Sequence, residues 1–319
     1  MHFEPEHPFE RAIEVSESDI EFEFRGFDEL AWSEFWLNPR QLRGSDFLMR
    51  WSQGVWSEER LVECLNAHGE FACYAYGPSG VAPTESVRDY ELYFERLEKA
   101  GLGGVKRPDL LVFRRSDADE AEQIIKKLGG EAELPFIPET DPGIRELLAQ
   151  AIVAIECENS LWVAKQMPAF GKQLKPMARL GGAMGLPKTA VLPTIILKEQ
   201  DRGPLQAWED AAGVPIHIWH SFYDLAYGIS LSAVQSLIAN GTVEPIEFTY
   251  QAPGGATTRK TIYKIYYLYT YPLGEALDEP MLKAQCITDK NGHILPYVTF
   301  EGGTMELKED ALNVLRKLS

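Results

Sequence analysis

Two carboxylates one residue apart end an apolar, strand-like segment of the chain. Residues 151–160 read AIVAIECENS, so five apolar residues run directly into Glu156 and Glu158. Alternate side chains of a strand share a face, so both glutamates point to the same side. Neighbouring carboxylates at the end of a buried strand repel each other and lose hydration, which raises their pKa unless a positive charge compensates. Hard oxygen ligands of this kind suit Mg²⁺.

A third acid stands at the start of another apolar segment. The sequence RPDLLVFRR (107–115) predicts a short strand, in which Pro108 fixes the entry and Asp109 comes directly before the apolar run. If this strand lies beside residues 151–158 in a sheet, Asp109, Glu156 and Glu158 converge on one point. We therefore expect these three acids to hold Mg²⁺.

The elements that must position these acids alternate between helix and strand. Apolar spacing, caps and Gly/Pro breaks predict helices at 57–69, 84–101 (capped by Thr84), 119–130, 161–182 (with a break near Pro168), 204–213, 230–241 and 308–318. Strands are predicted at 107–115, 151–158, 189–198 and 214–220, followed by a β-prone aromatic run at 260–271. This order predicts an α/β fold with one central sheet and a more β-rich C-terminal third.

The segment RPDLLVF, followed by a buried strand that ends in IECEN, resembles the PD-(D/E)XK nuclease superfamily, and type II restriction endonucleases in particular. The resemblance implies a central mixed sheet flanked by helices. It also implies that Asp109 and Glu156 hold Mg²⁺ beside the scissile phosphate. Glu158 stands where the family usually has Lys, so it would be a metal ligand, a general base or both. The resemblance covers about 84–220, which leaves 221–319 for DNA recognition and dimerisation within one nuclease domain spanning 1–319.

Two further positions enter through the resemblance and through spacing. The helix before the first motif strand often lends another acid in this superfamily, and Glu95 is the first candidate, with Glu91 one turn earlier as the next. Lys165 follows Glu158 by seven residues and is a candidate to approach the phosphate. The competing interpretation is that Glu95, Glu91 and Lys165 are ordinary solvated surface residues.

The chain has a net charge of −17, but its acidic residues are unevenly distributed. Residues 159–198 and 248–274 contain no acid, and a basic surface can attract a phosphate backbone even in an acidic protein. Ordinary solvated surface is the alternative for both stretches. The candidate DNA-binding residues are Lys165, Lys172, Lys175, Arg179, Lys188, Arg259 and Lys260.

The predicted function is Mg²⁺-dependent hydrolysis of double-stranded DNA by a type II restriction endonuclease. A palindromic site would imply a two-fold homodimer. A second hypothesis is a sequence-specific DNA-binding protein on the same fold without catalysis, because Glu158 replaces the usual Lys. A third is a glycoside hydrolase with paired glutamates, although two acids side by side on one strand do not flank a bond as such enzymes require.

The remaining features favour the cytoplasm. No apolar stretch approaches the roughly 20 residues that span a bilayer, and the acidic N-terminus does not look like a signal peptide. The four cysteines are scattered and form no CxxC pair, so they suggest neither a zinc site nor a disulfide framework. We therefore expect a cytoplasmic protein with no membrane association.

Overall fold

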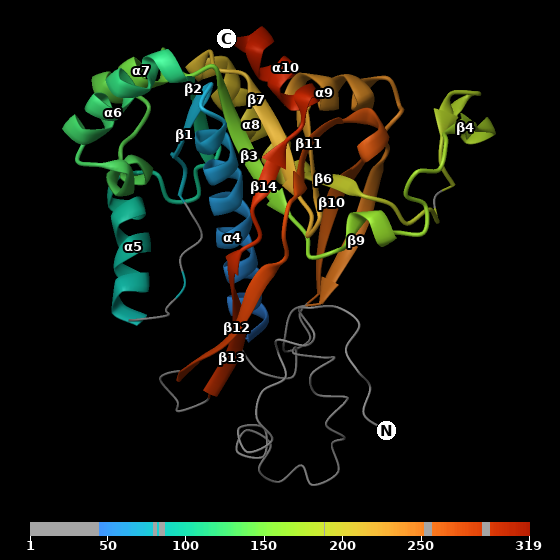
Figure 1. The fold of residues 1–319 in the computed structure, drawn as a ribbon, viewed down its shortest axis with the longest axis horizontal. Coiled ribbons are helices and arrows are strands. Elements are labelled where there is room, and N and C mark those ends of the chain that lie inside the picture. The colour runs from blue at the N-terminus through green and yellow to red at the C-terminus, as the bar shows by residue number, and fades with distance from the viewer. Residues whose placement is uncertain (1–44, 79–81, 83–86, 188, 252–256, 289–293) are drawn as a thin grey trace, which may run out of the picture.

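A mixed sheet of seven strands, in the order β1-β2-β3-β7-β8-β11-β14, forms the centre of the computed structural model (Figure 1). The structure describes residues 45–78, 82, 87–187, 189–251, 257–288 and 294–319. The strands of the sheet are β1 (Phe71–Ala75), β2 (Leu110–Arg114), β3 (Val153–Asn159), β7 (Ile216–Ser221), β8 (Leu225–Ser230), β11 (Tyr271–Ala276) and β14 (Met305–Leu307). β3 and β7 run parallel, and the other neighbouring pairs are antiparallel. The predicted central mixed sheet is confirmed.

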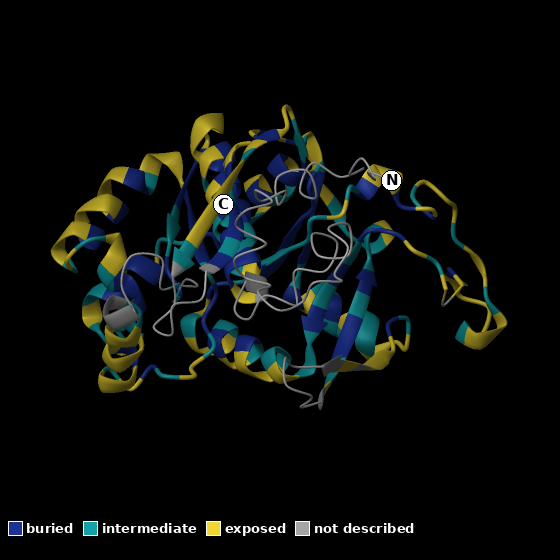
Figure 2. Ribbon diagram, turned by 90° about the horizontal axis from the view of Figure 1, so that it is seen from below, coloured by how far each residue is buried: buried dark blue, intermediate teal, exposed yellow. Residues whose placement is uncertain are grey.

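Helices cover both faces of this sheet because its central strands are apolar on both sides. On one face, α4 (Ser45–His68) and α10 (Glu309–Leu318) share a hydrophobic cluster with the side chains of Leu110, Val112, Val153 and Ile155. The opposite face carries the alternate residues of the same strands. They pack with the helices α6 (Ala118–Lys127), α7 (Pro142–Leu148), α8 (Glu199–Ala212) and α9 (Leu231–Ala239). Figure 2 shows the buried sheet between helices that expose their outer sides.

The C-terminal part is rich in strands, as predicted. β6 (Thr194–Lys198), β10 (Thr257–Tyr266) and β9 (Pro245–Gln251) form a three-stranded antiparallel sheet in that order. β12 (Pro280–Thr288) and β13 (Ile294–Gly302) form a separate two-stranded sheet that packs against α4. The strands of the central sheet come from as far apart as β1 and β14, so the sheet extends beyond both ends of the predicted 84–220 core.

The predicted helix at 161–182 is wrong. This stretch contains 3-10 turns at Ala164–Gln166 and Ala178–Leu180 and the short strand β4 (Lys175–Pro176), which pairs with β5 (Met184–Gly185) just beyond it. Prolines and glycines explain the difference, since Gly181 and Gly182 adopt φ values of 62° and 91° that a helix does not allow. Residues 171–187, here called the arm, project from the body and are largely exposed (Figures 1 and 2).

The helix expected at 57–69 is longer than predicted. α4 begins at Ser45, and Leu48, Met49, Ser52 and Trp56 continue its buried stripe toward the N-terminus. Ser57, where the predicted helix began, is therefore an interior residue of α4. α5 (Val87–Lys99) lies within the predicted 84–101, while Thr84 lies outside the described residues. None of the helices in the described part of the chain is both long enough and apolar enough to cross a membrane.

Candidate carboxylate site

The structure brings Asp109, Glu156 and Glu158 together at the end of β3. Leu110 of β2 lies opposite Ile155 of β3, so Asp109 comes opposite Glu156 on the same face of the sheet. The backbone N–H of Asp109 donates to the carbonyl of Ile155 at 2.8 Å. The backbone N–H of Cys157 in turn donates to Oδ2 of Asp109 at 2.6 Å.

A glycine in the segment after β1 permits this arrangement. The backbone N–H groups of Tyr76 and Gly77 both donate to the carbonyl of Asp109, at 2.8 and 3.1 Å. A Cβ atom added at Gly77 would lie 2.3 Å from the carbonyl oxygen of Pro108, a distance that forces the backbone apart. The turn into β2 can therefore hold Asp109 in place only with glycine at residue 77.

Glu156 is the most buried acid of the site, with 4% of its surface exposed. Its Oε1 lies 2.5 Å from Nζ of Lys106, while its Oε2 has no hydrogen-bond partner among the described residues. Burial and the nearby Asp109 carboxylate raise the pKa of Glu156 well above its usual value, and Lys106 opposes this rise. An unpartnered buried carboxylate oxygen costs free energy, so this position favours a proton or a cation.

Glu158 has a lysine partner of its own. Nζ of Lys198, at the end of β6, lies 3.3 Å from Oε1 of Glu158 and 3.7 Å from Oδ2 of Asp201. Burial raises the pKa of Glu158, and Lys198 is the main opposing charge. Lys106 and Lys198 thus supply positive charge to the site from two other segments. Lys198 belongs to the basic 159–198 segment, but neither lysine was predicted as a partner of the acids, although each stands near a strand boundary as the acids do.

A fourth acid comes from α4. Burial first, and then the Asp109 carboxylate, raise the pKa of Glu58 to about 8. Glu58 precedes Leu61 by three residues and Leu65 by seven, so it lies on the buried stripe of α4. This spacing was a usable signal, but a helix beginning at Ser57 would place Glu58 in its solvated first turn.

The predicted additional acids lie elsewhere. Glu95 and Glu91 are exposed on α5, which contacts the 3-10 segment Glu131–Phe136, whereas α4 lies against β1 and β3. Lys165 is also exposed, and its Nζ lies 2.5 Å from Oε1 of Glu275 on β11. The contacts described for Lys165 therefore join it to β11 and not to the carboxylates of β3.

The predicted DNA-binding residues divide between two elements. Lys172, Lys175 and Arg179 are exposed on the arm. On β10, Arg259 is exposed and Lys260 is half-buried, while Lys188 lies outside the described residues. The arm leads into β6, which pairs with β10, so both basic segments are attached to the same small sheet.

The donor chemistry of the site fits a divalent cation. Glu58, Asp109, Glu156 and Glu158 all have raised pKa values because burial disfavours their charged forms, and their oxygens are the ligands that Mg²⁺ prefers. Across the part of the chain that the structure describes, no three acidic, histidine or cysteine side chains form a ready-made metal cage. Lys106 instead occupies one oxygen of Glu156.

These features define a mixed α/β protein whose central strand ends in a buried carboxylate cluster paired with two lysines. Residues 189–319 match the family model described as AccI restriction endonuclease. The match begins after the three acids and includes Lys198, β7 and the strands of the C-terminal part. No curated protein and no solved structure matches the chain. The match covers 131 of the 319 residues, fewer than half, so it shows a similarity of the C-terminal part of the chain to this restriction endonuclease family.

Proposed function

We propose that the protein is a type II site-specific deoxyribonuclease of the PD-(D/E)XK superfamily, with a Glu-x-Glu variant of its motif, that hydrolyses DNA phosphodiesters with Mg²⁺. The observation that carries this proposal is Oε2 of Glu156, a buried carboxylate oxygen without a partner among the described residues, beside Asp109 and Glu158. The AccI restriction endonuclease match over 189–319 independently supports the restriction-enzyme part of this proposal.

Asp109, Glu156 and Glu158 would hold the cation. Bound Mg²⁺ supplies polarisation of the phosphate and a lowered pKa for bound water. The hydrogen bond from the N–H of Cys157 fixes the Asp109 carboxylate to the backbone of β3. Glu158 is proposed to accept a proton from the attacking water, because its raised pKa makes it a stronger base than an exposed glutamate.

The two lysines would replace the single lysine of the usual motif. Lys198 is half-buried beside Glu158, so its ammonium group is placed to approach a substrate phosphate. Lys106 is proposed to neutralise Glu156 until the cation binds. Lys165, which is exposed, is proposed to contact the DNA backbone, whereas Glu95, exposed on α5, is not part of the proposed carboxylate site.

The basic residues of the arm and of β10 are proposed to contact the DNA backbone, where phosphate contacts set affinity without reading sequence. The set consists of Lys172, Lys175, Arg179, Arg259 and Lys260. A two-fold homodimer that cuts both strands of a palindromic site belongs to the same proposal. Sedimentation of the protein with and without duplex DNA tests it.

Plasmid digestion tests the proposed activity directly. The wild type should yield discrete DNA fragments with Mg²⁺ and none with EDTA, and Asp109→Asn, Glu156→Gln and Glu158→Gln should each abolish cleavage. Glu120→Gln, on the exposed side of α6, is the matched control and should cleave as the wild type does. Full cleavage by Glu156→Gln would contradict the proposal.

One observation favours a second candidate, a sequence-specific DNA-binding protein without catalysis. The ammonium group of Lys106 already neutralises Oε1 of Glu156, so the cluster has a counter-charge without a metal. This candidate predicts a band shift with duplex DNA, no cleavage and no effect of EDTA. By contrast, the common face of the two glutamates on β3 gives no support to a glycoside hydrolase.

A further inference from the structure

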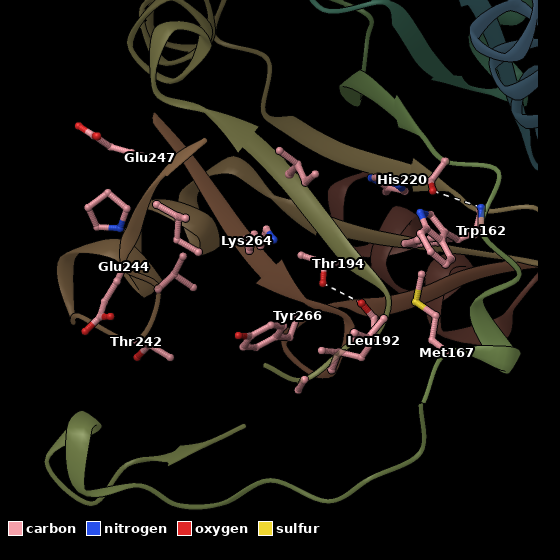
Figure 3. A pocket seen from close by; sticks show the side chains of 18 of the residues that line it. Trp162, Met167, Leu192, Thr194, His220, Thr242, Glu244, Glu247, Lys264 and Tyr266 are labelled. Carbon is pink, nitrogen blue, oxygen red and sulfur yellow. Dashed lines mark hydrogen bonds between the residues drawn. The ribbon is translucent and has the colours of Figure 1, made fainter. Parts of the chain in front are cut away.

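A cavity of about 750 Å³ opens beside the carboxylate site, between the ends of β3 and β7 and the small sheet of β6, β10 and β9. Its volume falls within the range of roughly 300–1,000 Å³ that is common for small-molecule sites. Figure 3 shows Trp162, Met167 and His220 gathered at one end and Glu244 and Glu247 at the other. The cavity is therefore aromatic at one end and acidic at the other.

The cavity and the carboxylate site are contiguous along two strands. Asn159, which lines the cavity, directly follows Glu158 on β3. Thr194 and Ile196 line it from β6, and Lys198 continues the same face of that strand to its contact with Glu158. With about 3.3 Å of rise per strand residue, Ile196 and Lys198 are separated by about 7 Å. A nucleotide next to the cleaved phosphodiester would reach the cavity.

His220 is the polar group that most needs a partner in this cavity. It is 3% exposed and lies beside Glu158 in the parallel register of β3 and β7. In the described structure, neither Nδ1 nor Nε2 of its ring has a hydrogen-bond partner. Its ring stacks on Phe222, with centroids 4.4 Å apart. Burial lowers the pKa of His220 to about 3, so the ring is neutral and offers one donor and one acceptor.

The charges in the cavity do not suit an anion. Arg179 donates to the carbonyl of Leu186 at 2.7 Å and lies 4.0 Å from Glu244, so much of its charge is already compensated. Lys264, Glu244 and Glu247 line the same cavity, so it carries charges of both signs (Figure 3). The exposed Trp162 and the half-buried Tyr266 instead offer flat apolar surfaces, on which nucleobases stack.

We propose that this cavity receives a nucleobase turned out of the DNA duplex next to the cleaved phosphodiester, stacked on Trp162 or Tyr266 and hydrogen-bonded by His220. The inference rests on the proposed nuclease function and adds a means of reading sequence to it. A base outside the duplex presents its edge to a protein pocket, and a neutral imidazole matches that edge with one N–H and one lone pair.

Free nucleotides test the cavity without requiring cleavage. Each of the four deoxynucleoside 5′-monophosphates is titrated into the full-length protein while the imidazole NMR signals of His220, identified by their loss in His220→Gln, are followed. At least one nucleotide should shift these signals saturably, and 2-deoxyribose 5-phosphate, which lacks the base, should not. Absence of a shift with all four nucleotides would overturn the proposal. An equal shift with the sugar phosphate would also overturn it and would assign the cavity to the backbone.

Two variants make the result specific. Trp162→Ala removes an exposed side chain and should weaken nucleotide binding roughly fivefold or more, in line with the loss of one stacking surface. Phe94→Ala, which removes an exposed aromatic ring on α5, should not change it. If plasmid DNA is cut but no nucleotide shifts the His220 signals, the proposal of a base-binding cavity is wrong and the proposed nuclease activity is retained. Nucleotide binding without any cleavage of DNA would contradict the proposed nuclease activity and support the base-binding cavity.

Discussion

The backbone N–H of Cys157 and the carboxylate of Asp109 are joined by a hydrogen bond of 2.6 Å between β3 and the residue that leads into β2. This bond favours the charged form of Asp109 and opposes the rise in pKa that burial causes. Because Cys157 stands between Glu156 and Glu158, the same bond fixes Asp109 relative to both glutamates. The geometry of the site therefore depends on the backbone of β3 as much as on its side chains.

Replacing Gly77 with alanine should displace Asp109. The new Cβ would lie 2.3 Å from the carbonyl of Pro108, so the two segments must separate, and the N–H groups that bind the Asp109 carbonyl move with them. We expect a loss of about 1–3 kcal/mol in the free energy of unfolding, typical of overpacking, together with loss of DNA cleavage. Urea unfolding and plasmid digestion measure these two effects.

Gly203→Ala is the control for this change. Gly203 is exposed within α8, and a Cβ there meets nothing within 4 Å, so alanine should leave cleavage unchanged and stabilise the helix by about 0.5–1 kcal/mol. Wild-type stability and cleavage in Gly77→Ala would show that the close approach to Pro108 is not required.

Removing the Lys106 charge should tighten Mg²⁺ binding. The ammonium group holds Oε1 of Glu156 at 2.5 Å and therefore competes with a cation for that oxygen. Hydrogen bonds to charged groups are worth about 1.5–3 kcal/mol, so Lys106→Met should increase the Mg²⁺ affinity by about tenfold or more. Calorimetric titration of the metal alone, without DNA, provides the measurement.

Lys198→Met is the comparison for Lys106→Met. Its partner Glu158 is more exposed than Glu156, and the two atoms are 3.3 Å apart, so the gain in affinity should be smaller. Weaker Mg²⁺ binding by Lys106→Met would mean that the lysine and the metal do not compete for Glu156.

Stability should fall as pH rises in metal-free buffer. The pKa of Glu58 is about 8 in the folded protein, against the ordinary glutamate value of 4.5 that applies to the unfolded chain. Between these values the unfolded chain has released the proton that the folded protein keeps, so the free energy of unfolding decreases from about pH 4.5 to pH 8 and then levels off. Asp109, Glu156 and Glu158 contribute with the same sign, because their pKa values are also raised.

Glu58→Gln should make this decrease smaller by about 1–2 kcal/mol, a value discounted for the partial exposure of Glu58. Urea unfolding at several pH values with EDTA measures it. Glu120→Gln, on the exposed side of α6, should keep the wild-type pH dependence. An unchanged pH dependence in Glu58→Gln would remove Glu58 from the acidic cluster.

Neutralising the arm should reduce the salt dependence of DNA binding. Lys172 and Lys175 are exposed on the arm, and each contact with a phosphate releases counterions. The plot of log binding constant against log salt concentration has a negative slope. Lys172→Gln and Lys175→Gln should each reduce the magnitude of this slope by about 0.9. Fluorescence anisotropy with a labelled duplex over a salt series gives this slope.

Lys126→Gln serves as the control for the arm variants, since Lys126 is exposed on α6 and pairs with Glu122 of its own helix. Its slope should equal that of the wild type. Equal slopes for the arm variants and the wild type would contradict a contact between the arm and DNA.

The strands that carry the three acids could be predicted because the relevant signals are local. A run of apolar residues ending in Glu156 and Glu158 reports a strand buried on both faces, and Pro108 marks the start of β2. The helix predicted at 161–182 failed for a local reason as well. The prediction relied on the apolar spacing of this stretch and gave too little weight to Pro168, Pro176 and the glycines at 181 and 182. Prolines and glycines of this kind break helices.

The rest of the site depends on contacts between distant segments. Glu58 reaches the acids only because α4 crosses the sheet, and Lys198 reaches Glu158 only because β6 ends beside β3. The spacing of Glu58 places it on the buried stripe of α4, but no pattern in the sequence shows that α4 or β6 approaches the acids. Lys106 is three residues from Asp109, yet its direction toward Glu156 depends on the antiparallel pairing of β2 and β3.

The hydrophobic cluster shared by α4 and α10 links the acidic helix to a segment far along the chain. Leu61 and Leu65 of α4 pack in the same cluster as Leu312 and Leu315 of α10. Such a contact closes a very long loop, whereas β2 and β3 pair across a much shorter one, and longer loops close at a higher entropic cost. The packing of the helix that carries Glu58 therefore includes a contact that closes a far longer loop than the strand pairing that brings Asp109 to Glu156.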